Sequence, residues 1–370
     1  MKTQAAVVVE TGKRIEIEEL TLDKPREGEV LIQYTHAGLC HSDVHIAHGD
    51  LEARLPMVLG HEGAGIIQEV GPGVSRVKVG DHVVCSFIPN CGSCRYCANG
   101  QQSICDMGAT ILEGYLPGPR FPITGPRGDY GAMCMLGTFS QYGVIHQNSC
   151  VKVDDDLPLE KAVLVGCGVP TGWGAAVNTA NVKAGQTVMV VGIGGIGINA
   201  VQGARLAGAK NIIAIDPLEN KREKAMELGA THSFASTDEA MEAITDLTRG
   251  QMADSAILTP GLMTSEIVAG GFNAVGKGGV VVLTGLNKLE EQNIELPGSI
   301  MTLFRKSLKG SLFGDCNPTV DIPRILGLYQ SGDLKLDEII TRTYTLDQVQ
   351  EGYDDLLAGK NVRGVVVHSH

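Results

Sequence analysis

Four cysteines crowd into one short segment of the 370-residue chain. Their spacing is Cys91-x2-Cys94-x2-Cys97-x7-Cys105, which is compact enough for four thiolates to surround one ion. Four thiolates leave a tetrahedral zinc ion without an open position, so such a site is structural. An iron–sulfur cluster is the competing interpretation, but the bacterial ferredoxin pattern has its fourth cysteine three residues after the third and before a proline. Here seven residues intervene and Asp106 follows, so the pattern favours zinc.

Two further cysteines and a histidine have side chains that could bind a second zinc ion. Cys40 follows a predicted strand, and His61 lies 21 residues beyond it in a Gly-His-Glu-Gly sequence. Cys167 lies where the β-rich first part of the chain gives way to a different pattern. Two cysteines and one histidine would leave the fourth position of a zinc ion open to water or substrate. Taken singly, however, a buried cysteine is commonly a core residue, and spacing alone does not join Cys167 to the other two.

A glycine-rich turn in the second half of the chain predicts a dinucleotide site. The turn is Gly192-Ile193-Gly194-Gly195-Ile196-Gly197. It follows a predicted strand at 187–191 and opens a predicted helix at 196–207, a context in which backbone N–H groups and the helix N-terminus bind a pyrophosphate. Asp216 ends the next strand, where a carboxylate would accept hydrogen bonds from a ribose and repel the 2′-phosphate of NADP. The alternative is a structural glycine turn beside an unrelated aspartate. Lys221 would reach a ribose hydroxyl or else be a solvated helix lysine.

The elements that must position these residues follow two patterns. Up to about residue 150, short strand-like segments alternate with Gly, Pro and Asp, and no long helical period appears. Beyond Cys167 strands alternate with helices, which implies a parallel, doubly wound sheet. The predicted strands cover 5–10, 14–22, 29–39, 63–71, 81–87, 187–191, 211–216, 256–259, 280–285, 307–313 and 363–368, and a charged helix covers 219–228.

Composition limits the classes of function. Hydrophobic residues at 43% and charged residues at 19% are typical of a globular protein with a large core. A formal charge of −12 argues against nucleic acid as a partner. The apolar runs are too short for a signal peptide or a membrane span, so we expect a cytoplasmic protein with no membrane partner. Ten cysteines in such a chain are more often metal ligands than disulfides. Four of them have no spacing partner and are expected to be small buried side chains: Cys85, Cys134, Cys150 and Cys316.

Longer motifs resemble the zinc-containing medium-chain dehydrogenase/reductase family, which includes the alcohol dehydrogenases, over essentially the whole chain. They are CHSDVH from residue 40, GHEGAG from 60, the four-cysteine segment, LVGCGVPTGWGAAV from 164, GIGGIG from 192 and KGSLFG from 309. The resemblance implies an α/β protein with a GroES-like, β-rich catalytic domain at 1–168 and 314–370 and a Rossmann coenzyme domain at 169–313. Residues 136–162 and 195–209 look most like the actinobacterial nitrosoaniline-dependent alcohol dehydrogenases, which hold their nicotinamide firmly.

The same resemblance assigns roles around the catalytic metal. It makes Cys40, His61 and Cys167 the ligands of a catalytic zinc, a set already known from alcohol dehydrogenase. Ser42 would take the proton of the alcohol, and His45 would pass it to solvent. Two acids would orient or tune the ligands: Asp43 and Glu62.

Cofactor contacts are implied for three further residues. Thr171 matches a contact on the nicotinamide side, and Arg363 matches a residue near the pyrophosphate. His41 stands where many animal members have an arginine that touches the pyrophosphate, and it is a weaker, pH-dependent partner for phosphate. Glutathione-dependent formaldehyde dehydrogenases have an arginine four residues after the last structural cysteine, where this chain has Ala109. That departure counts against a glutathione adduct as the substrate.

These features predict an NAD-dependent zinc alcohol dehydrogenase with two zinc ions per chain, acting between an alcohol or aldehyde and NAD. The resemblance also implies a homodimer or homotetramer and a tightly held nicotinamide, with residues 105–138 and 313–317 as candidates for closing over the ring. One alternative is a thiol-adduct formaldehyde dehydrogenase of the same family, and a zinc-free reductase would lack both cysteine sets. An alternative of another class is a zinc-thiolate redox sensor or holdase, which would need neither the glycine turn nor the Cys40–His61 pair.

Overall fold

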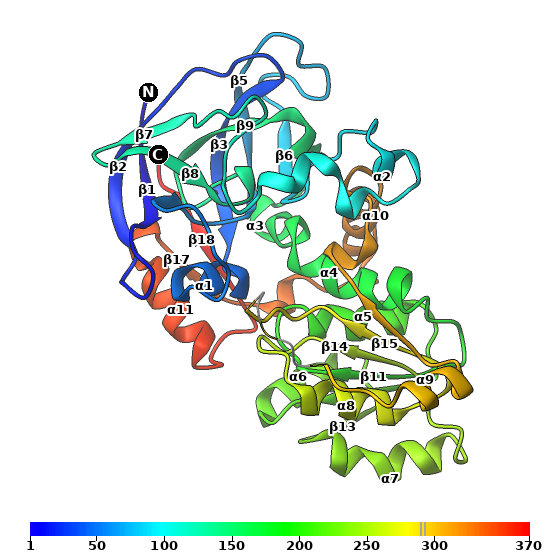
Figure 1. The fold of residues 1–370 in the computed structure, drawn as a ribbon. Helices are drawn as coiled ribbons and strands as arrows, with labels where there is room; N and C mark the ends of the chain where they lie inside the picture. The colour runs from blue at the N-terminus through cyan, green and yellow to red at the C-terminus, as the bar shows by residue number, and fades with distance from the viewer. Residues whose placement is uncertain (289–290, 292–293) are drawn as a thin grey trace. The chain divides into compact units, whose positions relative to one another are not determined.

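The computed structural model describes residues 1–288, 291 and 294–370, which form two compact units (Figure 1). The first unit comprises Met1–Cys167, Asn317–Ser331 and Leu336–His370. The second comprises Gly168–Cys316 and Gly332–Lys335. The two cysteine sets therefore lie in the first unit, and the glycine turn lies in the second.

Part of the first unit is a small closed barrel with the strand order β1-β2-β7-β8-β4. Its strands are β1 Lys2–Val8, β2 Glu16–Leu22, β4 Met57–Val58, β7 Ile123–Gly125 and β8 Gly128–Ala132. Alternate residues of these strands point inward and pack into one cluster with Leu20, Val58 and Tyr130 fully buried. The barrel gives the first unit a rigid core beside its larger sheet.

A seven-stranded sheet makes up the rest of the first unit, in the order β10-β6-β5-β3-β18-β17 with β9 paired to β3. Its strands are β3 Glu29–Gly38, β5 Glu62–Val70, β6 His82–Cys85, β9 Tyr142–His146, β10 Cys150–Lys152, β17 Ile340–Tyr344 and β18 Arg363–Val367. The register pairs Gly38 at the end of β3 with Glu62 at the start of β5 and with Val365 of β18. The end of β3, the start of β5 and the middle of β18 therefore meet at one point, although they are far apart in the sequence.

Five helices accompany these sheets: α1 His41–His48, α2 Arg95–Ala98, α3 Leu159–Ala162, α10 Pro318–Gln330 and α11 Val349–Leu357. The sequence showed no long helical period before residue 150, and α1 is the main exception. It has eight residues and ends at Gly49 in the left-handed conformation, with φ of +85°. Its pattern gave no helical signal because it buries the polar side chains of Asp43 and His45 along with apolar ones.

The second unit is a six-stranded parallel sheet in the order β13-β12-β11-β14-β15-β16. The strands are β11 Thr187–Val191, β12 Asn211–Ile215, β13 His232–Phe234, β14 Ala253–Leu258, β15 Val275–Leu283 and β16 Ser307–Gly310. The helices are α4 Gly168–Gly174, α5 Gly197–Leu206, α6 Glu219–Glu227, α7 Thr237–Leu247, α8 Ser265–Ala274 and α9 Gly298–Phe304, and they lie on both faces of the sheet (Figure 1). Numbered along the chain, this order is the 3-2-1-4-5-6 of dinucleotide-binding sheets, and the predicted doubly wound fold is confirmed.

Candidate functional site

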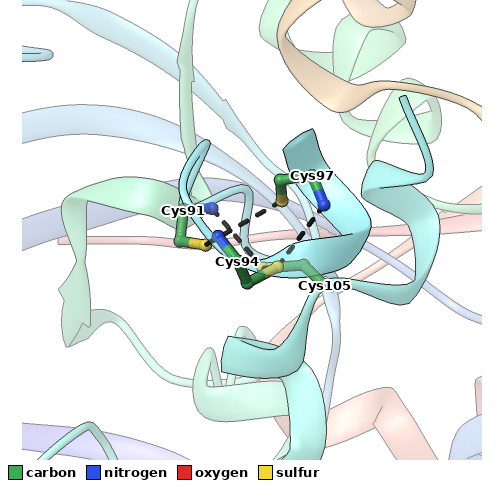
Figure 2. Close-up of side chains that lie close together, drawn as sticks. All are labelled: Cys91, Cys94, Cys97 and Cys105. Atoms are coloured by element: carbon green, nitrogen blue, oxygen red, sulfur yellow. Dashed lines mark hydrogen bonds between the residues drawn. The ribbon is translucent and has the colours of Figure 1, made fainter. Parts of the chain in front are cut away.

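The thiols of the four-cysteine segment converge on one point (Figure 2). The Sγ atoms of Cys91 and Cys97 lie 3.9 Å apart, as do those of Cys94 and Cys105. All four sulfur atoms lie within 4.8 Å of one another. A regular tetrahedron with zinc–sulfur bonds of about 2.3 Å has sulfur–sulfur edges of about 3.8 Å. The donor set and its spacing therefore fit one four-coordinate zinc ion.

Backbone amides of the same segment point at the sulfur atoms. The N–H of Cys94 donates to Sγ of Cys91 over 3.3 Å, and the N–H of Cys97 donates to Sγ of Cys94 over 3.4 Å. Amide donation from Cys97 lowers the pKa of the Cys94 thiol. Metal ligation requires the thiolate, so the turn before α2 prepares these sulfurs for zinc. Asn90 anchors the segment, because its amide donates to Oδ1 of Asn317 at the start of α10 over 2.9 Å.

A second group of ligating atoms comes together at the meeting point of the strand ends. Sγ of Cys40, a ring nitrogen of His61, a carboxylate oxygen of Glu62 and Sγ of Cys167 all lie within 4.8 Å of one another, and all four residues are buried. Cys40 follows β3 and precedes α1, and His61 immediately precedes β5. The structure also brings in Cys167, which spacing alone did not join to the others. It follows a short helical turn, η5 Val163–Gly166.

Glycines let these segments approach so closely. A Cβ at Gly38 would collide with the Glu62 carboxylate. A Cβ at Gly166 would lie 2.7 Å from the carbonyl oxygen of Cys85 on β6. Glycine at these two positions therefore lets the segments that precede Cys40 and Cys167 lie close against β5 and β6.

The polar atoms around His61 fit a metal ion. Both ring nitrogens are buried, and neither makes a hydrogen bond of regular geometry among the described residues; an unpartnered buried polar atom is costly. Nδ1 lies 3.3 Å from Oδ2 of Asp43, which leaves Nε2 on the opposite edge of the ring for a metal. Asp43 is itself held by the N–H of Gly60, which donates to its Oδ1 over 2.9 Å. A carboxylate on one ring nitrogen orients the other toward a metal, so two thiols and this imidazole fit a zinc ion with one open position.

The charges of this group depend on one another. A hydrogen bond between the two thiols lowers the pKa of Cys40 well below its usual value and raises that of Cys167. Burial raises the pKa of Glu62 to about 7, although Arg363 opposes the shift. Arg363 is buried and donates from Nη2 to Oε2 of Glu62. The structure therefore places the Arg363 guanidinium on Glu62, beside the ligating sulfurs.

The predicted proton path lies on α1. Oγ of Ser42 lies 3.8 Å from Sγ of Cys40, and His45, one turn further, shares its helix face. Nδ1 of His45 lies 3.0 Å from Oδ2 of Asp50. The ring of His41 has its centroid 6.5 Å from that of His45.

Sequence reasoning missed two residues of this region. Asp50 follows the helix-ending Gly49, and the closeness of a histidine and an aspartate across that turn was a signal that could have found it. Tyr353 on α11 is buried, and its hydroxyl has no hydrogen-bond partner among the described residues. Burial and the Asp43 carboxylate raise its pKa well above the usual value. Nothing local in the sequence linked Tyr353 to Asp43.

The glycine turn of the second unit leads from β11 into α5. Different physical constraints explain why glycine occupies each of its positions. Gly192 has φ of +84°, and a Cβ at Gly197 would collide with the carbonyl of Gly192. A Cβ at Gly194 would meet no protein atom within 4 Å. Packing within the protein therefore does not require glycine at this position. An open backbone at this place is what a pyrophosphate needs, and the turn fits a dinucleotide.

Asp216 lies beside the turn at the end of β12. Its Oδ2 accepts a hydrogen bond from the N–H of Ile193 over 2.7 Å, and its Oδ1 accepts one from Leu218 over 2.9 Å. The carboxylate therefore braces the turn in addition to any contact with a ribose. Lys221 is partly exposed on α6. Thr171 is buried on α4, next to Gly172, where a Cβ would collide with the carbonyl of Ile196 in the turn.

Across the described residues, every helix falls short of the length and apolar character that crossing a membrane requires.

Comparison with known proteins agrees with this geometry. Residues 26–155 match the alcohol dehydrogenase GroES-like domain, and residues 195–331 match the zinc-binding dehydrogenase domain. The protein is 62% identical to the NDMA-dependent alcohol dehydrogenase of Amycolatopsis methanolica and 56% identical to the putative alcohol dehydrogenase D of Mycobacterium tuberculosis, with 100% of each chain covered. The crystal structure of benzyl alcohol dehydrogenase from Acinetobacter calcoaceticus superimposes with a TM-score of 0.93 at 29% identity, again over 100% of both chains. With the predicted zinc, NAD and reaction class confirmed, the chain belongs to the zinc-dependent alcohol dehydrogenases of the medium-chain dehydrogenase/reductase family.

Proposed function

We propose that this enzyme oxidises its alcohol at a zinc ion held by Cys40, His61 and Cys167, and that the four-cysteine segment holds a second zinc ion with a structural role. The observation that carries the proposal is the convergence of two thiols and an unpartnered imidazole nitrogen at one buried point. The competing sensor or holdase function is not favoured, because it requires neither this group nor the glycine turn.

The residues around the catalytic group divide the work. Zinc, when bound, supplies a Lewis acid for the alcohol oxygen, and NAD supplies the hydride acceptor. Ser42 takes up the proton of the alcohol, and His45 passes it on toward solvent. Asp43 holds the ring of His61, while the Glu62–Arg363 pair balances charge beside the two thiols.

Residues of the second unit and two residues of the first are proposed to contact the dinucleotide. The backbone of the turn would receive the pyrophosphate through Gly192, Gly194, Gly195, Ile196 and Gly197. Asp216 and Lys221 would contact the adenosine ribose, and Thr171 the nicotinamide side. His41 and Arg363 would lie toward the pyrophosphate, and for Arg363 this contact would have to coexist with its bond to Glu62.

Three finer properties belong to the same proposal. The relative at 62% identity is named as NDMA-dependent, which supports an external hydride acceptor for this enzyme too. The resemblance to that group of enzymes further implies a nicotinamide that stays bound between turnovers. Six of the ten cysteines are proposed zinc ligands, a use of cysteine typical of a reducing compartment, which supports the cytoplasm. A homodimer or homotetramer is supported by β16, an outermost strand of its sheet, and by the exposed apolar side chains of Leu303 and Leu312 that flank it.

Replacing one cysteine from each set tests the two zinc assignments. We expect Cys167→Ser to abolish alcohol oxidation while the fold is kept, and to leave about one zinc per chain. Cys94→Ser should instead lower the melting temperature or the yield of folded protein, because the segment loses its metal. Zinc content, circular dichroism and turnover are measured on both variants. A Cys167→Ser protein with two zinc ions and full turnover would refute the catalytic assignment.

A further inference from the structure

Asp50 holds the proton-carrying histidine on its outer edge. Nδ1 of His45 lies 3.0 Å from Oδ2 of Asp50, within hydrogen-bond distance. The side chain of His45 is only 9% exposed, whereas that of Asp50 is 29% exposed. The carboxylate therefore stands between a nearly buried ring and the solvent.

The turn after α1 sets this contact. Gly49 ends the helix with φ of +85°, a conformation that glycine adopts without strain. The N–H groups of Gly49, Asp50 and Leu51 all donate to the carbonyl of His45, over 3.0, 2.8 and 3.2 Å. The chain thus folds back over His45 itself, and the backbone of Asp50 is fixed relative to the residue whose ring it contacts.

The chemistry of the pair determines which nitrogen of His45 is the base. An ionised carboxylate only accepts hydrogen bonds, so Nδ1 carries the hydrogen in this contact. In the neutral ring the lone pair then lies on Nε2. A ring held in the other tautomer would present a hydrogen where the relay must deliver a proton.

The geometry points to Asp50 as the positioning residue of the proton path, which fixes the tautomer of His45 and receives its outgoing proton. This inference rests on the proposed roles of Ser42 and His45. An N–H bond forms at Nε2 as the proton arrives, and the N–H bond at Nδ1 breaks toward Asp50. The more exposed carboxylate then gives the proton to water, and proton exchange with solvent returns the ring hydrogen from Nε2 to Nδ1 before the next turnover. No electrons move in this step, and the hydride leaves separately with the nicotinamide.

The main test compares Asp50→Asn with Asp50→Glu. Asparagine keeps the size of the side chain but cannot take up a proton, so kcat for benzyl alcohol, followed with a nitrosoaniline acceptor or with added NAD, should fall at least about tenfold. The KM for the alcohol should change less than about twofold, since the side chain of Asp50 acts through His45 and Asp50 is not one of the proposed metal ligands. Glutamate should restore much of the rate, and so should added formate in the asparagine variant. Asp337→Asn, which removes a carboxylate from a surface pair with Lys161, is the matched control and should leave kcat unchanged.

A spectroscopic measurement and a double variant supplement the comparison of single variants. Nitrogen-15 spectra of the zinc-loaded protein without alcohol should show His45 with its hydrogen on Nδ1, and Asp50→Asn should lose that preference. If Asp50 acts through His45, the double variant of Asp50→Asn with His45→Gln should be no slower than His45→Gln alone.

The outcomes separate the inference from the proposed function. An Asp50→Asn protein with the wild-type rate and tautomer would overturn the inference. So would a slow variant that neither formate nor glutamate restores and whose effect adds to that of His45→Gln, because Asp50 would then be only structural. A wild-type protein that oxidises no alcohol would refute the proposed function instead, and the tautomer measurement would still decide whether Asp50 fixes His45.

Discussion

Three polar side chains around the candidate catalytic site are among the most deeply buried of the first unit. Asp43 and Glu62 have no exposed surface, and His61 is almost as deeply buried. A buried charge costs several kcal/mol unless it is paired and hydrogen bonded, and apolar residues of similar size often serve stability as well. A metal ion held by the proposed ligands would therefore explain these residues better than the stability of the fold does.

Asp216 offers a direct test of cofactor choice. We expect Asp216→Gly to narrow the preference for NADH over NADPH by about tenfold, equivalent to about 1.4 kcal/mol, because both charge and bulk are removed where a 2′-phosphate would lie. The glycine variant also loses the bond to Ile193, which would weaken both dinucleotides, so the ratio of the two Kd values is the quantity to measure.

Asp216→Asn is the control for that experiment. Asparagine can still accept the hydrogen bond from Ile193 but has no charge, so it separates bracing of the turn from repulsion of phosphate. A wild-type protein that binds NADPH more tightly than NADH would contradict the role given to Asp216.

The predictability of single residues depended on whether their partners were local. The four-cysteine segment could be predicted because all its proposed ligands lie on one loop. The glycine turn could be predicted because a strand, the turn, a helix and an acidic residue follow one another in the sequence. Cys167 could be joined to Cys40 only through a family resemblance, since their meeting depends on the pairing of distant strands. Tyr353 gave no signal for the same reason, since the packing of α11 decides that the Asp43 carboxylate influences its hydroxyl.

At the scale of elements, the site is a junction of strand ends. The register between β3 and β5 places Glu62 beside Gly38, and β18 pairs with the same end of β3. The sequence predicted β18 as a strand but not its neighbours, because alternation fixes the two faces of a strand and not its partners. The first residue of β15 was also predicted wrongly. The sequence predicted a strand from 280, because Gly276, Gly278 and Gly279 are typical of a turn, but the strand begins at Val275.

His368, just after β18, makes this junction sensitive to acid. Burial lowers its pKa from 6.5 to about 4, and its Nε2 donates to the carbonyl of Thr138 over 2.9 Å. The unfolded chain therefore binds more protons than the folded one between these values, so stability falls as the pH drops from about 6.5 toward 4. The full difference corresponds to about 3 kcal/mol.

Urea unfolding at several pH values checks this expectation. His368→Gln keeps a side-chain donor but does not titrate, so its free energy of unfolding should fall less steeply between pH 6.5 and 4. His36 and His146 have pKa values lowered by burial and contribute in the same direction, so part of the slope should remain. Equal slopes for the two proteins would show that His368 is not the group responsible.

At the scale of the whole molecule, the open question is whether the nicotinamide leaves between turnovers. The pyrophosphate turn and Asp216 serve an exchanging and a retained cofactor equally well, so retention would need further contacts, for which residues 105–138 and 313–317 are the candidates. Phe313, Gly314 and Asp315 all have positive φ, which is unusual for two residues other than glycine and marks the second of these segments as constrained.

Denaturing freshly purified protein, prepared without added NAD, decides between the two modes. We expect about one equivalent of dinucleotide per chain by chromatography, together with alcohol oxidation that depends on an artificial acceptor. An empty protein that reduces added NAD steadily would instead be an ordinary exchanging dehydrogenase.

The insertion of β18 beside β3 has a consequence for how the enzyme is made. Arg363 reaches Glu62 across 301 positions of the sequence. On the ribosome, β3 and β5 emerge long before β18, so a growing chain has no partner for His36–Gly38 on that edge of β3 and a carboxylate that lacks its cation. The Glu62–Arg363 pair beside the proposed zinc ligands therefore forms only after β18 has been synthesised and has paired with β3. Fragments left by interrupted translation, which lack β18, should be inactive.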